Sequence, residues 1–527
     1  MSEVDALRTQ LRDRGYLTHG IERWFALDPF RSRAFWLELV TVALKAATLI
    51  AAFGALPFVA VMTLRNPALH ALETLGLFAT YGATWLAVAF AFVIAIALVL
   101  KIRPALAIDT PRALLAISLA SGALFVAPVA IWWTRFDTPP ATTELIAGAA
   151  LAVIFLIIVT FVVSAALLSF SIYELKRVPA IHQKPRTIPM AVAAIALIAL
   201  LFVPAYTRRE QTPREAMVVT TPVTRRIALI AVDGLTHEIL QSHPLTLPHV
   251  AAMRSVPGAS TTERWATLGT GVPTATHGVR AIEGVRFRGG RHVLQALSRS
   301  DFVLLNLAPA LGIARREPLP PTVRRRDYVW EIVARRGIPA LAVNWWTTDD
   351  RHEGALTSVG PASIFTASRG DALRLDAAAD ARFLRELDRT HPQFATIYLP
   401  ALDVVLNRLP LDQSSRLTQS LRALEGLSEL AQQTRNRGYE VIVIGLPGDG
   451  QQGRAVVASW MGLQIRNGED LAPVLLDLLG FPASDEMPGG SHAEPRIASY
   501  GNRAAASAAS RVDEDYYRNL KSLGYIR

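Results

Sequence analysis

The first two hundred residues of the chain consist largely of long apolar runs with few charged positions. Five of these runs are long enough to cross a bilayer, which takes a helix of about 20 residues. They lie near Trp36–Met62, Leu75–Leu100, Leu114–Trp133, Glu144–Phe170 and Pro189–Tyr206. The second and fourth runs are almost free of charge, which is rare for a buried helix of a soluble protein. The pattern predicts about five transmembrane helices within residues 36–206.

From residue 226 onward, short apolar runs alternate with longer stretches of helical periodicity. We expect strands at Arg226–Val232, Phe302–Leu307, Ala340–Asn344, Phe394–Leu399, Glu440–Gly445 and Arg454–Ser459, and helices such as Asp327–Arg336, Ala377–Thr390 and Gln413–Arg437. This alternation is typical of an α/β domain, doubly wound around a mostly parallel sheet. Ligands of such sheets gather at the carboxyl ends of strands. Residues that follow the strands of the 226–527 domain are therefore the first candidates for a site.

Basic residues alternate between rich and poor segments around the apolar runs. The rich segments hold Arg8, Arg12, Arg14, Arg23, Arg31 and Arg33 before the first run, Lys101, Arg103 and Arg112 after the second, and Lys176, Arg177, Lys184 and Arg186 after the fourth. The poor segments hold only Arg65 and Arg135. Because basic loops stay in the cytoplasm, we expect an integral protein of the inner (cytoplasmic) membrane with a cytoplasmic N-terminus. Five spans then make the 226–527 domain extracytoplasmic.

Two shorter segments flank the predicted spans. Residues 1–35 lack the apolar core of a cleavable signal and are interpreted as a cytoplasmic amphipathic segment at the membrane surface. Residues 207–225 are rich in Thr, Pro and Arg and are interpreted as a linker.

Composition excludes some kinds of chemistry. The chain has no cysteine, which excludes disulfides, thiolate metal sites and cysteine nucleophiles. Its net charge is +10, but much of this charge lies in the predicted cytoplasmic loops, where anionic headgroups account for it. We therefore expect the lipid bilayer as a partner and no nucleic acid.

Candidate chemistry lies in four ordered segments of the predicted α/β domain. They read RIALIAVDG from Arg226, STTERWATLGTGVPTATHGV from Ser260, VNWWTTDDRHEGALTSVG from Val343, and FATIYLPALDVVLNRLP from Phe394. From about Ile227 to the C-terminus the chain resembles the type I phosphodiesterase/nucleotide pyrophosphatase family of the alkaline phosphatase superfamily. The resemblance implies that Asp233 is a metal ligand, Thr261 the nucleophile, and Asp403 the aspartate of a D-x-x-x-H metal motif.

The resemblance also implies a reaction. In phosphoryl transfer, positive charge stabilises the equatorial oxygens and the nucleophile is held in place. Two divalent ions about 4 Å apart can activate a hydroxyl and hold the leaving oxygen. A threonine hydroxyl alone is a weak nucleophile and depends on a metal or a base.

Three of the implied metal-binding segments depart from the family pattern. By strand register, its S-D-H-G motif falls on Gly445, Leu446, Pro447 and Gly448. The histidine of D-x-x-x-H is replaced by Asn407, and the stretch Gly450–Trp460, where a late histidine is implied, contains none. A complete two-zinc site is therefore not supported, and we expect either no cofactor or a single weakly bound divalent metal.

Several candidate site residues have a second interpretation. Asn407 and Asp449 are candidate substitute ligands, but Asp449 lies in P-G-D-G, a strong turn signal. Thr261 opens a predicted helix and could merely cap it. Trp345 and Trp346 could line a binding pocket or could lie in the core.

Three functional hypotheses follow. The leading one is a membrane-anchored pseudoenzyme that binds a phosphorylated glycan or lipid, or scaffolds an envelope protein partner. The alternative is an active, metal-dependent phosphodiester hydrolase or headgroup transferase that uses Thr261 and a reduced metal site. A transport protein is the weakest, because the apolar runs contain almost no ionisable residues.

Overall fold

A computed structural model describes residues 35–66, 69, 71–102, 111–136, 142–174, 225–258, 260–297, 301–463, 465–489, 496–503 and 514–526. The chain forms two compact units. The helical unit contains the residues up to 209 together with 285–315, and the sheet unit contains 210–284 and 316–527. The predicted fifth span, almost all of the N-terminal segment and nearly the whole linker lie outside the described residues.

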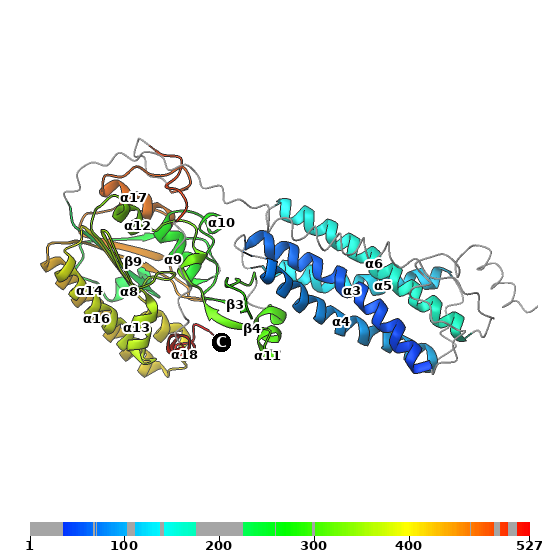
Figure 1. The fold of residues 1–527 in the computed structure, drawn as a ribbon. Helices are drawn as coiled ribbons and strands as arrows, with labels where there is room; N and C mark the ends of the chain where they lie inside the picture. Colours follow the sequence, from blue (N-terminus) through cyan, green and yellow to red (C-terminus); the bar gives the residue numbers. More distant parts are fainter. Residues whose placement is uncertain are drawn as a thin grey trace, which may run out of the picture. The chain divides into compact units, whose positions relative to one another are not determined.

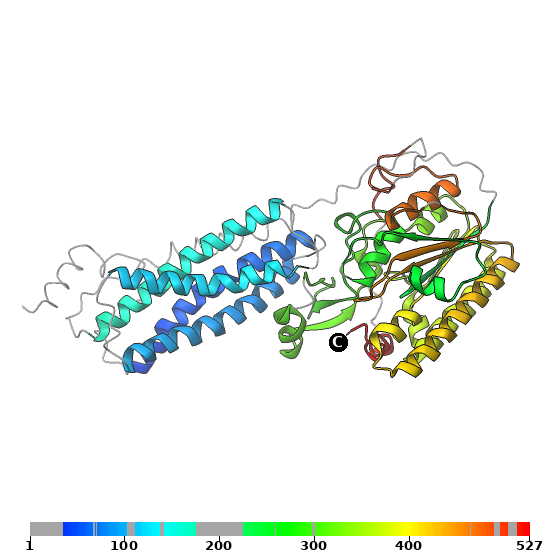
Figure 2. The same ribbon diagram turned by 180° about the vertical axis from the view of Figure 1, so that it is seen from behind.

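Within the described residues, the helical unit contains four long helices, which can be followed in Figure 2. They are α3 (Phe35–Arg65), α4 (Ala71–Ile102), α5 (Pro111–Thr134) and α6 (Thr142–Glu174). Each is long and apolar enough to cross a membrane, as the first four apolar runs predict. An alanine-rich face of α3, including Ala43, Ala47 and Ala55, is buried. Small residues on such a face let helix backbones approach closely in a membrane.

The sheet unit is built around an eight-stranded sheet in the order β2-β10-β9-β1-β8-β5-β7-β6. Its strands are β1 (Ile227–Asp233), β2 (His249–Met253), β5 (Ala340–Val343), β6 (Arg351–Glu353), β7 (Leu356–Val359), β8 (Phe394–Leu399), β9 (Glu440–Leu446) and β10 (Ala455–Ser459). The five central strands are parallel, whereas β10 is antiparallel to β9 and β2, and β6 is antiparallel to β7. The sheet is mostly parallel, as predicted.

Helices cover both faces of this sheet (Figure 1). One layer contains α13 (Pro361–Ser368), α14 (Ala372–Thr390) and α16 (Gln413–Asn436), and the other contains α9 (Thr261–Thr270), α12 (Val329–Arg335) and α17 (Leu471–Leu478). Shorter helices are α8 (His237–Ser242), α10 (Thr274–His277), α15 (Ala401–Asp403) and α18 (Glu514–Ser522). The arrangement is the doubly wound fold that the sequence predicts.

One predicted strand is wrong. Residues 302–307 do not join the sheet, because Val303–Leu307 form a π-helical turn, η2, within the helical unit. A short, continuous apolar run does not distinguish a buried strand from a buried helix. Here the run packs on α4, a neighbour that local sequence does not reveal.

The register of the central strands assembles the site. Every residue of β1 is buried, and its last residue, Asp233, lies beside Leu446 of β9. The preceding residue, Val232, lies beside Leu399 of β8, and the chain after β8 leads directly to Asp403. Gly234 has a φ of 81°, and a Cβ on it would lie 2.6 Å from the Asp403 backbone nitrogen. Glycine at this position therefore permits the close approach of the β1 and β8 ends.

Candidate functional site

Thr261 is the first residue of α9 and does not cap it. The cap is Ser260, whose hydroxyl accepts a hydrogen bond from the Glu263 backbone N–H at 3.1 Å. The Thr261 side chain is fully buried. Because Ser260 supplies the cap, the Thr261 hydroxyl can bond instead to groups at the carboxyl ends of the strands.

The Thr261 hydroxyl lies between a carboxylate and a guanidinium. It donates to Asp449 Oδ1 at 3.2 Å and accepts from Arg408 Nη2 at 3.1 Å. The same Asp449 oxygen accepts from Arg264 Nη2 at 3.0 Å, and Arg264 Nη1 donates to the Pro447 carbonyl at 2.6 Å. The turn that carries Asp449 thus brings its carboxylate to Thr261. Asp449 is the candidate substitute for the acidic side chain that is absent at Leu446.

Asp403 has both carboxylate oxygens occupied by N–H donors. Oδ2 pairs with Arg408 Nε at 2.5 Å, and Oδ1 accepts from Asn407 Nδ2 at 2.8 Å. Residues 404–408 form a π-helical turn, a rare conformation that is frequent at functional sites. This turn lets the residues four and five positions after Asp403 reach the same carboxylate.

The orientation of the Asn407 amide follows from its neighbours. The Gly448 N–H donates to Gln451 Oε1 at 2.7 Å, and Gln451 Nε2 donates to the Gly234 carbonyl at 3.0 Å. The Gln451 oxygen therefore faces Asn407, whose Nδ2 lies 3.2 Å away. With acceptors on two sides, Asn407 directs its amide nitrogen to Asp403. An asparagine that binds a metal ion would instead direct its amide oxygen to the ion.

Asp233 is fully buried and has a strongly shifted pKa. Burial raises the pKa of Asp233 to about 8; the charge of Asp403 acts in the same direction, whereas Arg408 and Arg264 oppose the rise. Its Oδ2 accepts from the Tyr398 hydroxyl at 3.0 Å. Its Oδ1 is buried without a hydrogen-bond partner among the described residues. Asp233 is thus mainly protonated at neutral pH.

Two carboxylates and two guanidiniums pair with one another at the site. With Asp233 protonated, the carboxylates of Asp403 and Asp449 face the guanidiniums of Arg264 and Arg408. The Arg408 side chain is only 8% exposed. Its guanidinium also lies 4.1 Å from the ring centroid of Tyr525, a cation–π contact with the C-terminal segment.

The residues present do not fit a two-metal centre. Within the described ranges, no group of three or more His, Asp or Glu side chains is arranged to hold a metal. Leu446, at an implied ligand position, is fully buried. A Cβ built on Gly448 would overlap Asp403 Oδ1 and Asn407 Nδ2, so the loop after β9 packs closely over the Asp403 carboxylate. Guanidinium and amide N–H groups bind the oxygens that metal ions would take.

The sequence pattern did not single out the two arginines that supply the guanidinium N–H groups. Arg264 lies three positions after Thr261, and Arg408 follows Asn407 directly. Their proximity to two implied family positions was the available signal. Gln451 and Tyr398 gave no comparable signal, because their roles depend on which strands lie side by side.

The two predicted binding tryptophans lie in an aromatic core. Trp345 is fully buried and donates from Nε1 to the Thr396 hydroxyl at 2.9 Å. Trp346 is 3% exposed, and its ring lies 5.7 Å from that of Tyr398, the residue that donates to Asp233. The pair supports the site from within the core, and a direct ligand contact by either remains a prediction.

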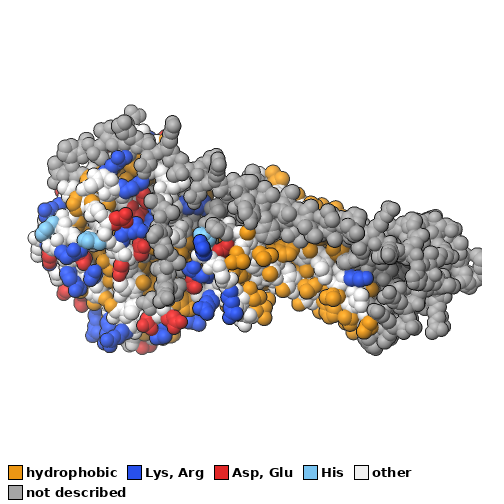
Figure 3. Space-filling view, in the orientation of Figure 1, with side chains coloured by type: hydrophobic (Ala, Val, Ile, Leu, Met, Phe, Trp, Pro, Cys, Tyr) orange, Lys and Arg blue, Asp and Glu red, His pale blue; other side chains and the backbone are white. Residues whose placement is uncertain are grey.

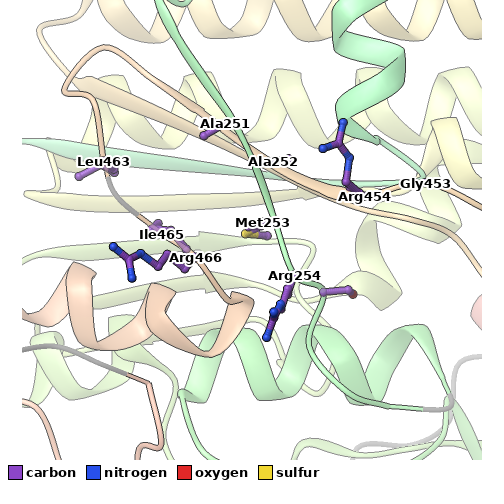
Figure 4. Close-up of a pocket in the computed structure, with 10 residues that line it drawn as sticks. Ala251, Ala252, Met253, Arg254, Gly453, Arg454, Leu463, Ile465 and Arg466 are labelled. Carbon is purple, nitrogen blue, oxygen red and sulfur yellow. The ribbon is translucent and has the colours of Figure 1, made fainter.

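A surface hollow of about 620 Å³ lies elsewhere in the sheet unit, along β2 and β10 (Figure 4). Its lining includes Arg254, Arg454 and Arg466. Arg454 pairs with Glu238 at 2.9 Å. None of the site residues described above lines this hollow.

A substitution at Gly448 tests the packing of the loop over Asp403. Because a Cβ at this position would overlap Asp403, we expect Gly448→Ala to lower the free energy of unfolding by about 1–3 kcal/mol. Gly426→Ala is the matched control: a Cβ on Gly426 of α16 would meet nothing within 4 Å, and alanine there should stabilise the helix by about 0.5–1 kcal/mol. Urea unfolding of both variants in detergent micelles measures the difference. Equal stability of the two would contradict the close packing.

A family model and several solved structures are similar to the sheet-containing part of the chain. Residues 227–445 match the family model described as type I phosphodiesterase/nucleotide pyrophosphatase. No curated protein matches the chain in sequence. Among solved structures, murine ectonucleotide pyrophosphatase/phosphodiesterase 5 is similar at 12% identity with a TM-score of 0.30, covering 42% of this chain and 56% of that one.

Two further structures show the same level of similarity. The human ectonucleotide pyrophosphatase/phosphodiesterase 5 has 12% identity, a TM-score of 0.34, and coverage of 50% of this chain and 97% of that one. Phosphonoacetate hydrolase from Sinorhizobium meliloti 1021 has 11% identity, a TM-score of 0.29, and coverage of 44% and 60%. Scores this low carry no conclusion about activity.

The mostly parallel sheet and the family match agree, and the sheet brings Asp233 at the end of β1 near Asp403, which follows β8. Residues 227–445 therefore form a type I phosphodiesterase/nucleotide pyrophosphatase-like domain, preceded in the chain by apolar helices that can span a membrane.

Proposed function

We propose that this protein is a membrane-anchored pseudoenzyme in which arginine side chains have replaced the catalytic metal ions. In this proposal it belongs to the inner membrane, with the phosphodiesterase-like domain extracytoplasmic. The domain binds a phosphorylated glycan or lipid, or scaffolds an envelope protein partner. The observation that carries the proposal is the pairing of Arg408 with Asp403, Thr261 and Asp449.

Two physical arguments support loss of catalysis. First, positive charge must be available to the phosphoryl oxygens in the transition state. Here the guanidiniums of Arg264 and Arg408 are already bound to carboxylates. Second, the Thr261 side chain is fully buried, so a phosphodiester could reach its hydroxyl only if the surrounding ion pairs separated. Both features favour a closed, charge-balanced site.

One observation favours the alternative, an active hydrolase or headgroup transferase. The Thr261 hydroxyl donates to Asp449 at 3.2 Å, which is the arrangement of a nucleophile with a general base. If the ion pairs opened, Asp449 would take the hydroxyl proton while Thr261 Oγ1 attacked phosphorus. The P–O bond to the leaving alcohol would break in the same step, and the departing alkoxide would take a proton from solvent. The reduced metal site of this alternative would still depend on carboxylates that now bind arginine.

Turnover of a generic phosphodiester distinguishes the two functions. We expect the purified full chain and its Thr261→Ala variant to hydrolyse bis-(p-nitrophenyl) phosphate equally slowly, with or without added Zn²⁺, Mg²⁺ or Ca²⁺. Thr418→Ala, on the exposed surface of α16, controls for handling of the protein. A loss of about a hundredfold or more on removing the Thr261 hydroxyl would establish catalysis and overturn the pseudoenzyme proposal.

A further inference from the structure

Residues 285–315 interrupt the sequence of the phosphodiesterase-like domain but pack with the helical unit. Strands β3 (Glu283–Phe287) and β4 (Ala314–Pro318) pair with each other. Between them lie an isolated bridge from Val285 to Leu294, the turn η2, and α11 (Ala308–Ala310). This insertion makes a specific set of contacts with the helices.

Three polar anchors hold the insertion. Glu73 of α4 accepts hydrogen bonds from the backbone N–H groups of Arg291 at 2.9 Å and His292 at 3.3 Å. The Asn66 amide, just after α3, bonds to the backbone N–H and carbonyl of Gln295 at 3.3 and 3.4 Å. Buried polar groups need such partners, and Glu73 is only 1% exposed.

The third anchor is a buried carboxylate. Asp301 is 4% exposed and accepts from the Tyr81 hydroxyl at 2.6 Å and from Trp132 Nε1 at 3.1 Å. Tyr81 belongs to α4 and Trp132 to α5, so this one side chain joins two helices. The adjacent anchors on α3 and α4 place the insertion at the end of the unit that holds the α3–α4 connection.

A glycine on α4 makes room for an aromatic ring of the insertion. A Cβ built on Gly76 would lie 2.8 Å from the Phe287 ring. Phe287 itself is 3% exposed and belongs to the same apolar cluster as Leu77 and Tyr81 of α4. The Phe287 ring of the insertion therefore fills the space that the missing side chain of Gly76 leaves on α4.

The stretch from Asp301 to Ile313 reads DFVLLNLAPALGI and is almost wholly apolar. Leu304, Leu305 and Ala308 pack into the cluster with the helices. Phe302 and Leu311, in contrast, are 64% and 59% exposed. Two large apolar side chains facing outward on one short stretch are unfavourable in water.

The end of α3 and the start of α4 also carry exposed apolar side chains. Leu64, Leu72 and Leu75, near the same anchors, are 43%, 49% and 53% exposed. Hydrophobic side chains cover the visible described faces of the long helices (Figure 3). A surface of this kind on spanning helices faces lipid.

We propose that residues 301–313 are a membrane-seated element, whose outward side chains Phe302 and Leu311 lie in the apolar part of the bilayer interface beside α4. The partner of this surface is the lipid bilayer. The element lies on the side of the membrane that holds the α3–α4 connection, the side that the charge pattern predicts to be extracytoplasmic. Residues 301–313 thus contact the bilayer whether or not the phosphodiesterase-like domain is catalytically active.

Bromolipid quenching tests the proposal, and the absence of native cysteine makes single labels straightforward. Phe302→Cys and Leu311→Cys, each labelled with bimane in phosphatidylethanolamine/phosphatidylglycerol proteoliposomes, should show blue-shifted emission that brominated lipid quenches. Leu72→Cys is the lipid-facing reference. Leu417→Cys, at 58% exposure on α16, matches Leu311 in exposure and should stay unquenched. Emission from positions 302 and 311 that resembles that of position 417 would overturn the proposal.

A disulfide tests the docking of the insertion separately. The pair Asn66→Cys and Gln295→Cys should cross-link under mild oxidation, because the Asn66 amide contacts the Gln295 backbone. The pair Ile102→Cys and Gln295→Cys, which uses the opposite end of α4, should not. Gly76→Leu should reduce the first cross-link by displacing Phe287. Failure of the first pair to cross-link, in protein that still inserts into lipid vesicles, would contradict the docking.

Discussion

Replacement of Arg408 by leucine is expected to lower the free energy of unfolding of the sheet unit by about 3–5 kcal/mol. The substitution leaves Asp403, which is fully buried, without its guanidinium partner. It also removes the donor to Thr261 and the contact with Tyr525. Breaking a buried pair is costly because the remaining charge stays in a medium of low dielectric constant.

Urea unfolding in detergent micelles, with hydrogen exchange of β1 and β8 to localise the change, measures this effect. The matched control is Arg437→Leu, which breaks the exposed pair with Asp388 and should cost no more than about 1 kcal/mol. The double variant Asp403→Leu/Arg408→Leu should recover much of the loss, since apolar replacements of buried pairs are often well tolerated. Equal costs for the Arg408 and Arg437 variants would show that Asp403 does not depend on the guanidinium.

Substitution of Asp233 by asparagine is expected to flatten the pH dependence of stability. The pKa of Asp233 rises on folding from an ordinary 3.8 to about 8. Between these values the folded chain holds a proton that the unfolded chain has released, so stability falls as pH rises. The slope from this group is about 1.4 kcal/mol per pH unit, and it vanishes above the folded pKa.

Unfolding midpoints measured from pH 5 to pH 8 test this sign. The wild-type chain should lose stability across the range relative to Asp233→Asn, and the variant should gain most at the alkaline end. Glu238→Gln is a useful contrast, because its arginine hydrogen bond lowers the pKa of Glu238 to about 2, below the tested range. A wild-type profile parallel to that of Asp233→Asn would mean that Asp233 is ionised in the folded protein.

Much of the fold could be predicted from the sequence because its signals are local. The run IALIAVD is apolar up to its last residue, Asp233, as expected of a central strand that brings a carboxyl group to a sheet edge. Parallel pairing of β1 with β8 and β9 then brings Asp403 and the loop after β9 to the same edge. The apolar helices were predictable from length alone.

The charge balance of the site could not be predicted in the same way. It depends on a π-helical turn that directs two successive side chains to Asp403, and local propensity does not specify such a turn. The amide of Asn407 is oriented by Gln451, which is 44 positions away. Likewise, the short apolar run at residues 302–307 was predicted as a strand. The helix α4 on which it packs lies about two hundred positions earlier in the chain, so local sequence does not reveal this contact.

The measurement that tests the central claim most directly is zinc binding by the purified full chain. Elemental analysis followed by calorimetric titration with Zn²⁺ should find no stoichiometric metal and no tight binding, because Arg408 and Asn407 hold both oxygens of Asp403. The unfolding midpoint should not change with EDTA. One or two equivalents of zinc that are lost on Asp403→Asn substitution would contradict the claim that guanidinium groups have replaced the metal ions.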